Sequence, residues 1–277
     1  MRRQIKLIAL DLDGTTFNSD KVITERTKQA IASAIAQGVI VMPATGRPKN
    51  GLPESFLSIP GVRYALTSNG GAVWDLYENQ VLVGDFMPYE TVCRVIDRLL
   101  QIDALVEFYH DGKAYADQKS YDRALTGYEN FPDWFKNYVK KSRIPVDNLR
   151  ERVYSGKYQI EKMLASFNDL SLRQQLFDTL HTNPELSVVF GNSFNVEISA
   201  ATANKGYSLL RFAEAMGITK DEIMVCGDTM NDRTMFAAAG LAVAMGNADA
   251  DIKAMADDMT LSNDEDGVAV AIEKWVL

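Results

Sequence analysis

Short apolar runs alternate with amphipathic stretches at the start of this chain. Residues 6–10, Lys-Leu-Ile-Ala-Leu, are almost wholly apolar, which is typical of a strand buried on both faces of a parallel sheet. Thr24 can cap a following helix that runs to about Gln37, and Gly38 can end it. A second apolar run follows at 39–42. This strand–helix–strand order predicts an α/β fold with a doubly wound, Rossmann-like parallel sheet.

The composition changes after Gly84, beyond which aromatic residues become frequent. Residues 119–157 have no clean periodicity, and we expect them to be partly irregular. The aromatic side chains either build the core of this segment or stack on a ligand ring, and the sequence leaves both open. On either side of the irregular stretch, periodicity predicts helices at 89–101 and 169–182 and strands at 105–109, 114–117, 160–165 and 186–190.

Alternating strands and helices resume from residue 191. We therefore expect a discontinuous core domain, formed by residues 1–84 and 191–277, and an inserted α+β domain at residues 85–190. Two helices over an antiparallel sheet would form this insert. Each of the two domains is long enough to bury a hydrophobic core.

Charge and residue types disfavour several classes of protein. The formal net charge is −8, the pI is about 4.9 and no Lys/Arg-rich run is present, which disfavours nucleic-acid binding. No apolar stretch has the length of a signal peptide or a membrane span, so we expect a cytoplasmic protein. Cys93 and Cys226 are the only cysteines, and His110 and His181 the only histidines, which indicates neither a disulfide framework nor a zinc site.

Acidic residues follow two of the predicted strands directly. Asp11 and Asp13 follow the first strand, and Asp228 and Asp232 follow an apolar run at 223–226. Open α/β sheets bind their ligands at the carboxyl ends of the strands. Successive strand residues point to opposite faces, so Asp11 and Asp13 share a side if the chain stays extended. Two carboxylates at such a short distance repel each other, unless a cation lies between them or one of them keeps its proton.

The segment Asp11-Leu12-Asp13-Gly14-Thr15 resembles the first motif of the haloacid dehalogenase-like phosphohydrolases. The whole chain is similar to their Cof-type sugar-phosphatase branch, in which a large cap domain is inserted into the core. Thr16 and Arg233 depart from the pattern of this branch. Four further segments match it in order: Thr45-Gly46-Arg47, Asn204-Lys205-Gly206, Gly227–Asp232 and Gly240–Ala248.

The resemblance implies a role for each of these motifs. Asp11 would attack phosphorus as the nucleophile, Asp13 would act as general acid and base, and Lys205 would neutralise charge on the phosphoryl group. Independently of the resemblance, we expect Arg47 either to bind substrate or an anion or to form a surface ion pair. The expected phosphate-binding residues are Leu12, Thr45, Gly46, Lys205 and Asn231. The expected ligands of Mg²⁺ are Asp11, Asp13 through its backbone carbonyl, and Asp228, with Asp232 in the outer shell.

The expected function is Mg²⁺-dependent hydrolysis of small phosphorylated metabolites through an aspartyl-phosphate intermediate. Sugar phosphates are the leading substrate class by resemblance, followed by pyridoxal phosphate. A phosphomutase of the same superfamily is one alternative. A catalytically silent regulator that binds phosphometabolites is another, although the intact residues Asp11, Asp13, Lys205 and Asp228 argue against it. We expect a monomer or homodimer with neither nucleic-acid nor membrane partners.

Overall fold

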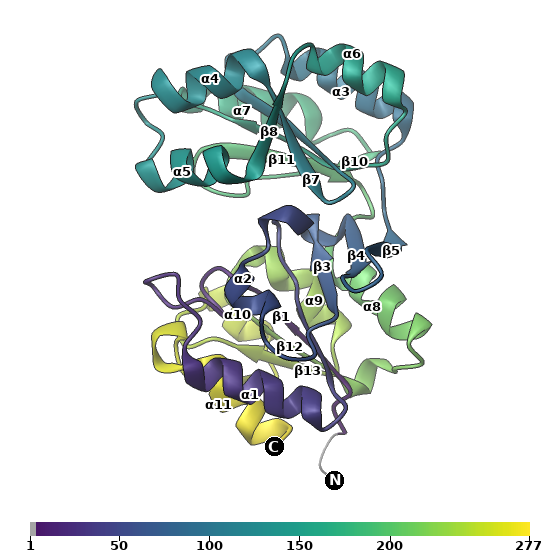
Figure 1. Cartoon of the computed structure of the whole chain (residues 1–277), viewed down its shortest axis with the longest axis vertical. Coiled ribbons are helices and arrows are strands. Elements are labelled where there is room, and N and C mark those ends of the chain that lie inside the picture. The colour runs from purple at the N-terminus through teal and green to yellow at the C-terminus, as the bar shows by residue number, and fades with distance from the viewer. Residues whose placement is uncertain (1–3) are drawn as a thin grey trace. The chain divides into compact units, whose positions relative to one another are not determined.

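The computed structural model describes residues 4–277, and its contacts divide the chain into two compact units. The core unit holds the chain up to Arg47 together with residues 52–84 and 204–277. The cap unit holds residues 48–51 and 85–203. Both are drawn in Figure 1.

A five-stranded sheet lies at the centre of the core unit, in the order β14-β13-β12-β1-β2. Every neighbouring pair in it is parallel, as predicted. Its strands are β1 (Leu7–Leu10), β2 (Ile40–Pro43), β12 (Ile223–Gly227), β13 (Leu241–Ala244) and β14 (Asp258–Met259). The side chains of β1 are completely buried, which explains its unbroken apolar sequence.

Helices cover both faces of this sheet (Figure 1). The chain steps from β1 to β2 in one direction and from β12 to β13 in the other, so right-handed crossovers place α1 and α9 on opposite faces. α1 packs against α11, and α8 packs against α9. The core-unit helices are α1 (Glu25–Ala36), α2 (Glu54–Leu57), α8 (Lys205–Ala215), α9 (Arg233–Ala238), α10 (Ala250–Met255) and α11 (Gly267–Trp275). A separate antiparallel sheet consists of β3 (Tyr64–Thr67), β4 (Ala72–Asp75) and β5 (Gln80–Gly84).

The cap unit is an α+β domain around a six-stranded sheet, in the order β10-β11-β9-β6-β7-β8. All its strand pairs are antiparallel except β7 with β8. The strands are β6 (Leu105–His110), β7 (Lys113–Asp117), β8 (Arg143–Val146), β9 (Ile160–Ser166), β10 (Leu186–Val189) and β11 (Asn195–Ala200). The helices are α3 (Tyr89–Leu99), α4 (Gln118–Thr126), α5 (Asp133–Ser142), α6 (Leu149–Gly156) and α7 (Leu170–Leu180).

Two expectations about this insert need correction. The expected boundary at 190/191 is wrong, because β11 pairs with β9 and β10 and so completes the cap sheet; the core unit resumes at Asn204. Residues 119–157 are also more regular than expected. Asp117 and Asn148 cap α4 and α6 with their side chains, and aromatic side chains bury one face of α5. Many of the cap aromatics are thus core residues, such as Phe108, Phe131 and Phe135.

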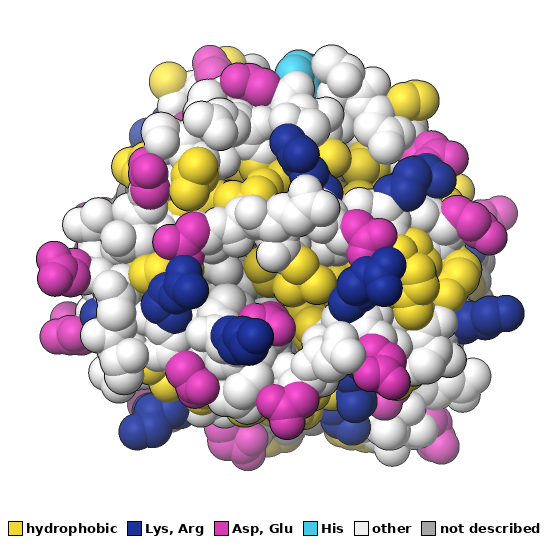
Figure 2. Space-filling model, turned by 90° about the horizontal axis from the view of Figure 1, so that it is seen from above, with side chains coloured by type: hydrophobic (Ala, Val, Ile, Leu, Met, Phe, Trp, Pro, Cys, Tyr) yellow, Lys and Arg dark blue, Asp and Glu magenta, His cyan; other side chains and the backbone are white. Residues whose placement is uncertain are grey.

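The surface carries charges of both signs. On the face shown in Figure 2, Lys and Arg side chains lie among Asp, Glu and apolar side chains instead of forming one basic patch. Among residues 4–277, none of the helices is long and apolar enough to span a membrane.

Candidate active site

The candidate site lies where β1 and β12 end side by side. These strands are parallel neighbours with Leu10 opposite Cys226, so the residues that follow them meet at one edge of the sheet. The Asp11 backbone N–H donates to the carbonyl of Cys226 at 3.1 Å, which fixes the start of the first loop. Asp11 and Asp228 are brought together in this way although the sequence separates them widely.

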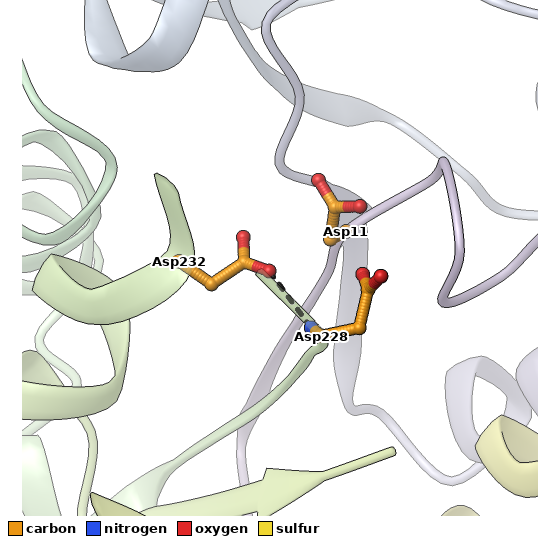
Figure 3. A group of neighbouring side chains, drawn as sticks. All are labelled: Asp11, Asp228 and Asp232. Carbon is orange, nitrogen blue, oxygen red and sulfur yellow. Dashed lines mark hydrogen bonds between the residues drawn. The ribbon is translucent and has the colours of Figure 1, made fainter. Parts of the chain in front are cut away.

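Three buried carboxylates gather at this edge. Asp11, Asp228 and Asp232 each offer an oxygen, and these oxygens lie within 4.8 Å of one another. Figure 3 shows the three side chains converging from the end of β1, the end of β12 and the turn before α9. Hard oxygen ligands are those that Mg²⁺ prefers. The residues present therefore fit a divalent cation.

Lys205 lies between two of these carboxylates. Its Nζ donates to Asp11 Oδ1 at 2.6 Å and to Asp232 Oδ1 at 2.7 Å, and its side chain is completely buried. Lys205 is the first residue of α8, which Asn204 caps by accepting from the N–H of Tyr207. The cap residue fixes where the helix starts, and so fixes where the ammonium points.

Asp232 uses both carboxylate oxygens within the protein. Oδ1 accepts from Lys205, and Oδ2 accepts from the backbone N–H groups of Asp228 at 2.9 Å and Thr229 at 3.3 Å. The bond to Asp228 N–H is the dashed line in Figure 3. Asp232 thus holds both the lysine and the Asp228 backbone in place, which is the arrangement of an orienting residue.

Burial has the largest influence on the ionisation of these groups. It raises the pKa of Asp11 to about 8, although the Lys205 ammonium acts in the opposite direction. Burial also raises the pKa of Asp228 to about 6. For Lys205, burial acts to lower the pKa, but Asp11 and Asp232 outweigh it and raise that pKa above its ordinary value. A further cation would favour the charged carboxylates.

Asp13 lies in a different environment from Asp11. Its side chain is 46% exposed, whereas that of Asp11 is 6% exposed. Arg47 Nη2 donates to both Asp13 oxygens at 2.9 Å, Arg47 Nε donates to Oδ2 at 3.1 Å, and Lys21 Nζ adds a contact at 3.2 Å. Of the two alternatives for Arg47, the structure contains the ion pair, and its partner is Asp13.

The other residues predicted to bind phosphate do not take part in the network of Lys205 and the three buried carboxylates. The hydroxyl oxygen of buried Thr45 accepts from the N–H of Arg47 at 3.2 Å, which leaves its O–H to donate. Gly46 follows it in the same turn. The Leu12 side chain is completely buried, so only its backbone is suited to hold a ligand. Asn231 is exposed, and its Oδ1 accepts from the hydroxyl of Thr229 at 2.8 Å.

Sequence reasoning missed two contacts at this edge. Thr15 Oγ1 donates to Asp228 Oδ1 at 2.8 Å, which joins the first motif to the last one. Asn247 Nδ2 donates to the carbonyl of Gly14 at 2.8 Å. Both residues lie in segments that were recognised by resemblance, but nothing in their spacing assigns them a partner. The fold supplies the partners.

Comparisons with known proteins agree with this geometry. A family model described as haloacid dehalogenase-like hydrolase matches residues 8–272. The 5-amino-6-(5-phospho-D-ribitylamino)uracil phosphatase YcsE of Bacillus subtilis (strain 168) is 32% identical over 273 residues, covering 99% of this chain and 96% of that protein. The pyridoxal phosphate phosphatase YbhA of Escherichia coli (strain K12) is 29% identical over 270 residues, covering 95% and 96%.

A solved structure shares the whole fold. It is that of a haloacid dehalogenase-like hydrolase from B. subtilis, with a TM-score of 0.82 and 26% identity, and the match covers 97% of this chain and 99% of that one. Sequence family, curated relatives and fold therefore agree over nearly the full length. The chain belongs to the haloacid dehalogenase-like hydrolases and is a phosphatase of their Cof-type branch.

Proposed function

We propose that this enzyme hydrolyses small phosphorylated metabolites in a Mg²⁺-dependent reaction through an aspartyl-phosphate intermediate. The observation that supports this most directly is the buried Asp11 carboxylate, with the Lys205 ammonium at 2.6 Å and Asp228 beside it. A carboxylate in this setting is a competent nucleophile toward phosphorus, because the neighbouring positive charge offsets repulsion by the phosphate.

In the first step, a carboxylate oxygen of Asp11 forms a bond to phosphorus as the bond to the leaving oxygen breaks. The electron pair of the broken bond goes to the leaving oxygen, which takes a proton from Asp13. Lys205 offsets the charge of the transferring group, and Thr45, Gly46, Asn231 and the backbone of Leu12 hold its oxygens.

In the second step, Asp13 accepts a proton from water, and that water attacks phosphorus. The acyl phosphate bond breaks, which releases inorganic phosphate and restores Asp11. The side chain of Asp11 is 6% exposed and that of Asp13 is 46% exposed, so the two carboxyl groups lie in different environments. Burial favours the protonated form of Asp11, so its proposed role as nucleophile requires the positive charges of Lys205 and of a bound metal ion. Asp11, the backbone carbonyl of Asp13, and Asp228 would hold Mg²⁺, with Asp232 orienting them. Bound Mg²⁺ supplies the positive charge that favours ionised Asp11.

Sugar phosphates remain the leading substrate class in this proposal. The names of the relatives agree with one candidate of the sequence analysis, pyridoxal phosphate, which is named for YbhA. They add one more, a phosphoribitylamino-pyrimidine, which is named for YcsE. All three are phosphate monoesters of small alcohols, so one catalytic site serves them. The leaving alcohol would have to be distinguished elsewhere in the protein, and the cap unit is the proposed place.

The test is phosphate release from a panel of sugar phosphates, pyridoxal 5′-phosphate and 5-amino-6-(5-phospho-D-ribitylamino)uracil, with Mg²⁺ or EDTA. We expect metal-dependent release by the wild type and none by Asp11→Asn. Asp251→Asn, a substitution of an exposed aspartate on α10, is the matched control and should retain activity. Phosphate release that persists in Asp11→Asn would contradict the proposed nucleophile.

Acid-quench trapping of a phosphoenzyme separates the alternatives. A trapped phosphoenzyme without net phosphate release would indicate a phosphomutase. Substrate binding without a phosphoenzyme would indicate a silent regulator.

A further inference from the structure

The loop that carries Asp13 is anchored along its length to the C-terminal part of the core unit. This loop, residues 11–24, connects β1 to α1. Asn247 and the turn at residues 263–266 supply the anchors. They are the bonds Asn247 Nδ2 to Gly14 O (2.8 Å), Asn263 Nδ2 to Phe17 O (2.9 Å), Ser19 N and Oγ to Asp264 (2.7 Å each), and Thr24 Oγ1 to Asp266 Oδ1 (2.5 Å).

Asn247 is the anchor nearest to the proposed chemistry. Its Nδ2 donates to the carbonyl of Gly14, the residue directly after Asp13, and its Oδ1 accepts from the N–H of Asn263 at 3.0 Å. Both ends of the amide are therefore engaged, which fixes the direction in which it donates. The Asn247 side chain is exposed, so its contribution to the hydrophobic core is small.

We propose that Asn247 is a positioning residue for Asp13 during protonation of the leaving group. This inference rests on the proposed function. As the bond between phosphorus and the leaving oxygen breaks, the electron pair goes to that oxygen. The protonated carboxyl group of Asp13 must then lie within hydrogen-bonding distance of the leaving oxygen to transfer its proton. The side-chain hydrogen bonds of Asn247 go to Gly14 and Asn263. Asn247 acts by holding the Gly14 carbonyl, and Asn263 orients it.

The position of Asp11 depends less on the hydrogen bond between Asn247 and Gly14 than the position of Asp13 does. Asp11 directly follows β1, donates its N–H to Cys226 and is held by Lys205. Loss of Asn247 should therefore disturb protonation of the leaving group more than attack by Asp11. Two substrates separate these contributions. A sugar alcohol leaves poorly without a proton, whereas 4-nitrophenolate leaves without one.

The experiment compares kcat/KM for 4-nitrophenyl phosphate with kcat/KM for the sugar phosphate that the wild type cleaves fastest. For each substrate, kcat/KM reports only the steps up to and including phosphoenzyme formation. In Asn247→Ala, we expect the value for the sugar phosphate to fall by about 10- to 100-fold and that for 4-nitrophenyl phosphate to change little. Asn247→Asp keeps the acceptor for Asn263 but loses the donor to Gly14, and should behave like Asn247→Ala.

The matched control is Thr219→Ala. Thr219 also forms a side-chain hydrogen bond, from its hydroxyl to Glu222 Oε2 at 3.0 Å, but it lies at the amino end of β12, whereas Asp228 follows the carboxyl end of that strand. Both kcat/KM values of this control variant should equal those of the wild type. Equal losses on the two substrates in Asn247→Ala, or no loss on either, would overturn the positioning role. Absence of phosphate release by the wild type would instead contradict the proposed function itself, and with it this role.

Discussion

A methyl group placed on Gly14 would lie 2.2 Å from Asp228 Oδ2. The backbone of the first motif therefore packs directly against the carboxylate of the last one, and only a hydrogen atom fits between them. Gly14 also has a φ of +89°, a conformation that other residues adopt with strain. Two independent constraints, space and backbone conformation, thus require glycine at this position.

Gly14→Ala should weaken Mg²⁺ binding because the added methyl group displaces Asp228. Gly38→Ala is the matched control, since Gly38 has a φ of +86° but its Cβ would meet nothing within 4 Å. Both variants should lose about 1–2 kcal/mol of stability from backbone strain. Only Gly14→Ala should lose metal affinity in a calorimetric titration. Equal affinities in the two variants would contradict the clash.

Lys205→Met should destabilise the protein and abolish phosphoenzyme formation. Removing one partner from a buried ion-pair network leaves Asp11 and Asp232 uncompensated, at a cost on the order of 3–5 kcal/mol near pH 8. The loss should shrink at lower pH, where Asp11 takes a proton. Denaturant unfolding measures the change. Lys274→Met, which removes a surface pair with Asp258, should cost less than about 1 kcal/mol.

Asp228→Asn should mainly lower metal affinity, whereas Asp232→Asn should mainly lower the stability of the fold. Without Mg²⁺, Asp228→Asn should be neutral or stabilising at pH 8, because burial disfavours the charge of that residue, but its metal affinity should fall most. Asp232→Asn replaces an acceptor by a donor and should cost about 1–3 kcal/mol of stability. Metal titration and denaturant unfolding of both variants test this. A larger loss of metal affinity in Asp232→Asn would make Asp232 a direct ligand.

Without Mg²⁺, the stability supplied by Asp11 and Asp228 should decline as the pH rises. Their folded pKa values, about 8 and about 6, lie above the ordinary value of 3.8. Between pH 3.8 and the folded pKa values, the folded state binds more protons than the unfolded state. The stabilisation from these two protonated carboxyl groups is therefore complete below pH 3.8, and it is lost as the pH rises through each folded pKa.

The stabilisation by Mg²⁺ should grow over the same range, because ligand carboxylates have to be ionised. Thermal unfolding at about pH 5 and about pH 8, with Mg²⁺ or EDTA, measures both effects. Asp11→Asn should flatten the metal-free slope. A slope that is the same in the wild type and in Asp11→Asn would contradict the assignment to Asp11.

The parallel core could be predicted because its strands are buried on both faces, which gives short, unbroken apolar runs such as residues 6–10. The acidic residues after two of these strands then pointed to one edge of the sheet. The cap was harder to predict. Periodicity located β6 and β9 to within one residue, although these strands bury polar side chains such as Glu107 and Lys162. It failed in residues 119–157, where side-chain caps fix the starts of α4 and α6 and aromatic residues cover one face of α5.

Contacts between distant loops could not be predicted at all. The pairing of Arg47 with Asp13 and of Asn247 with Gly14 depends on how turns at different strand ends meet. A charged or polar residue in a turn has the same sequence signal whether it faces solvent or another loop. Resemblance identified these segments, and only the fold assigned their partners.

The interior position of β1 in the core sheet also affects how the protein is made. β1 lies between β2 and β12 in the core sheet, and the whole cap unit is encoded between those neighbours. On the ribosome, the first two strands emerge early, but the partner that completes the active site emerges only with residues 223–227. The cap sheet can assemble before that point. We therefore expect nascent chains to carry an unfinished, exposed parallel sheet for much of synthesis, which is the stage at which chaperones are most needed.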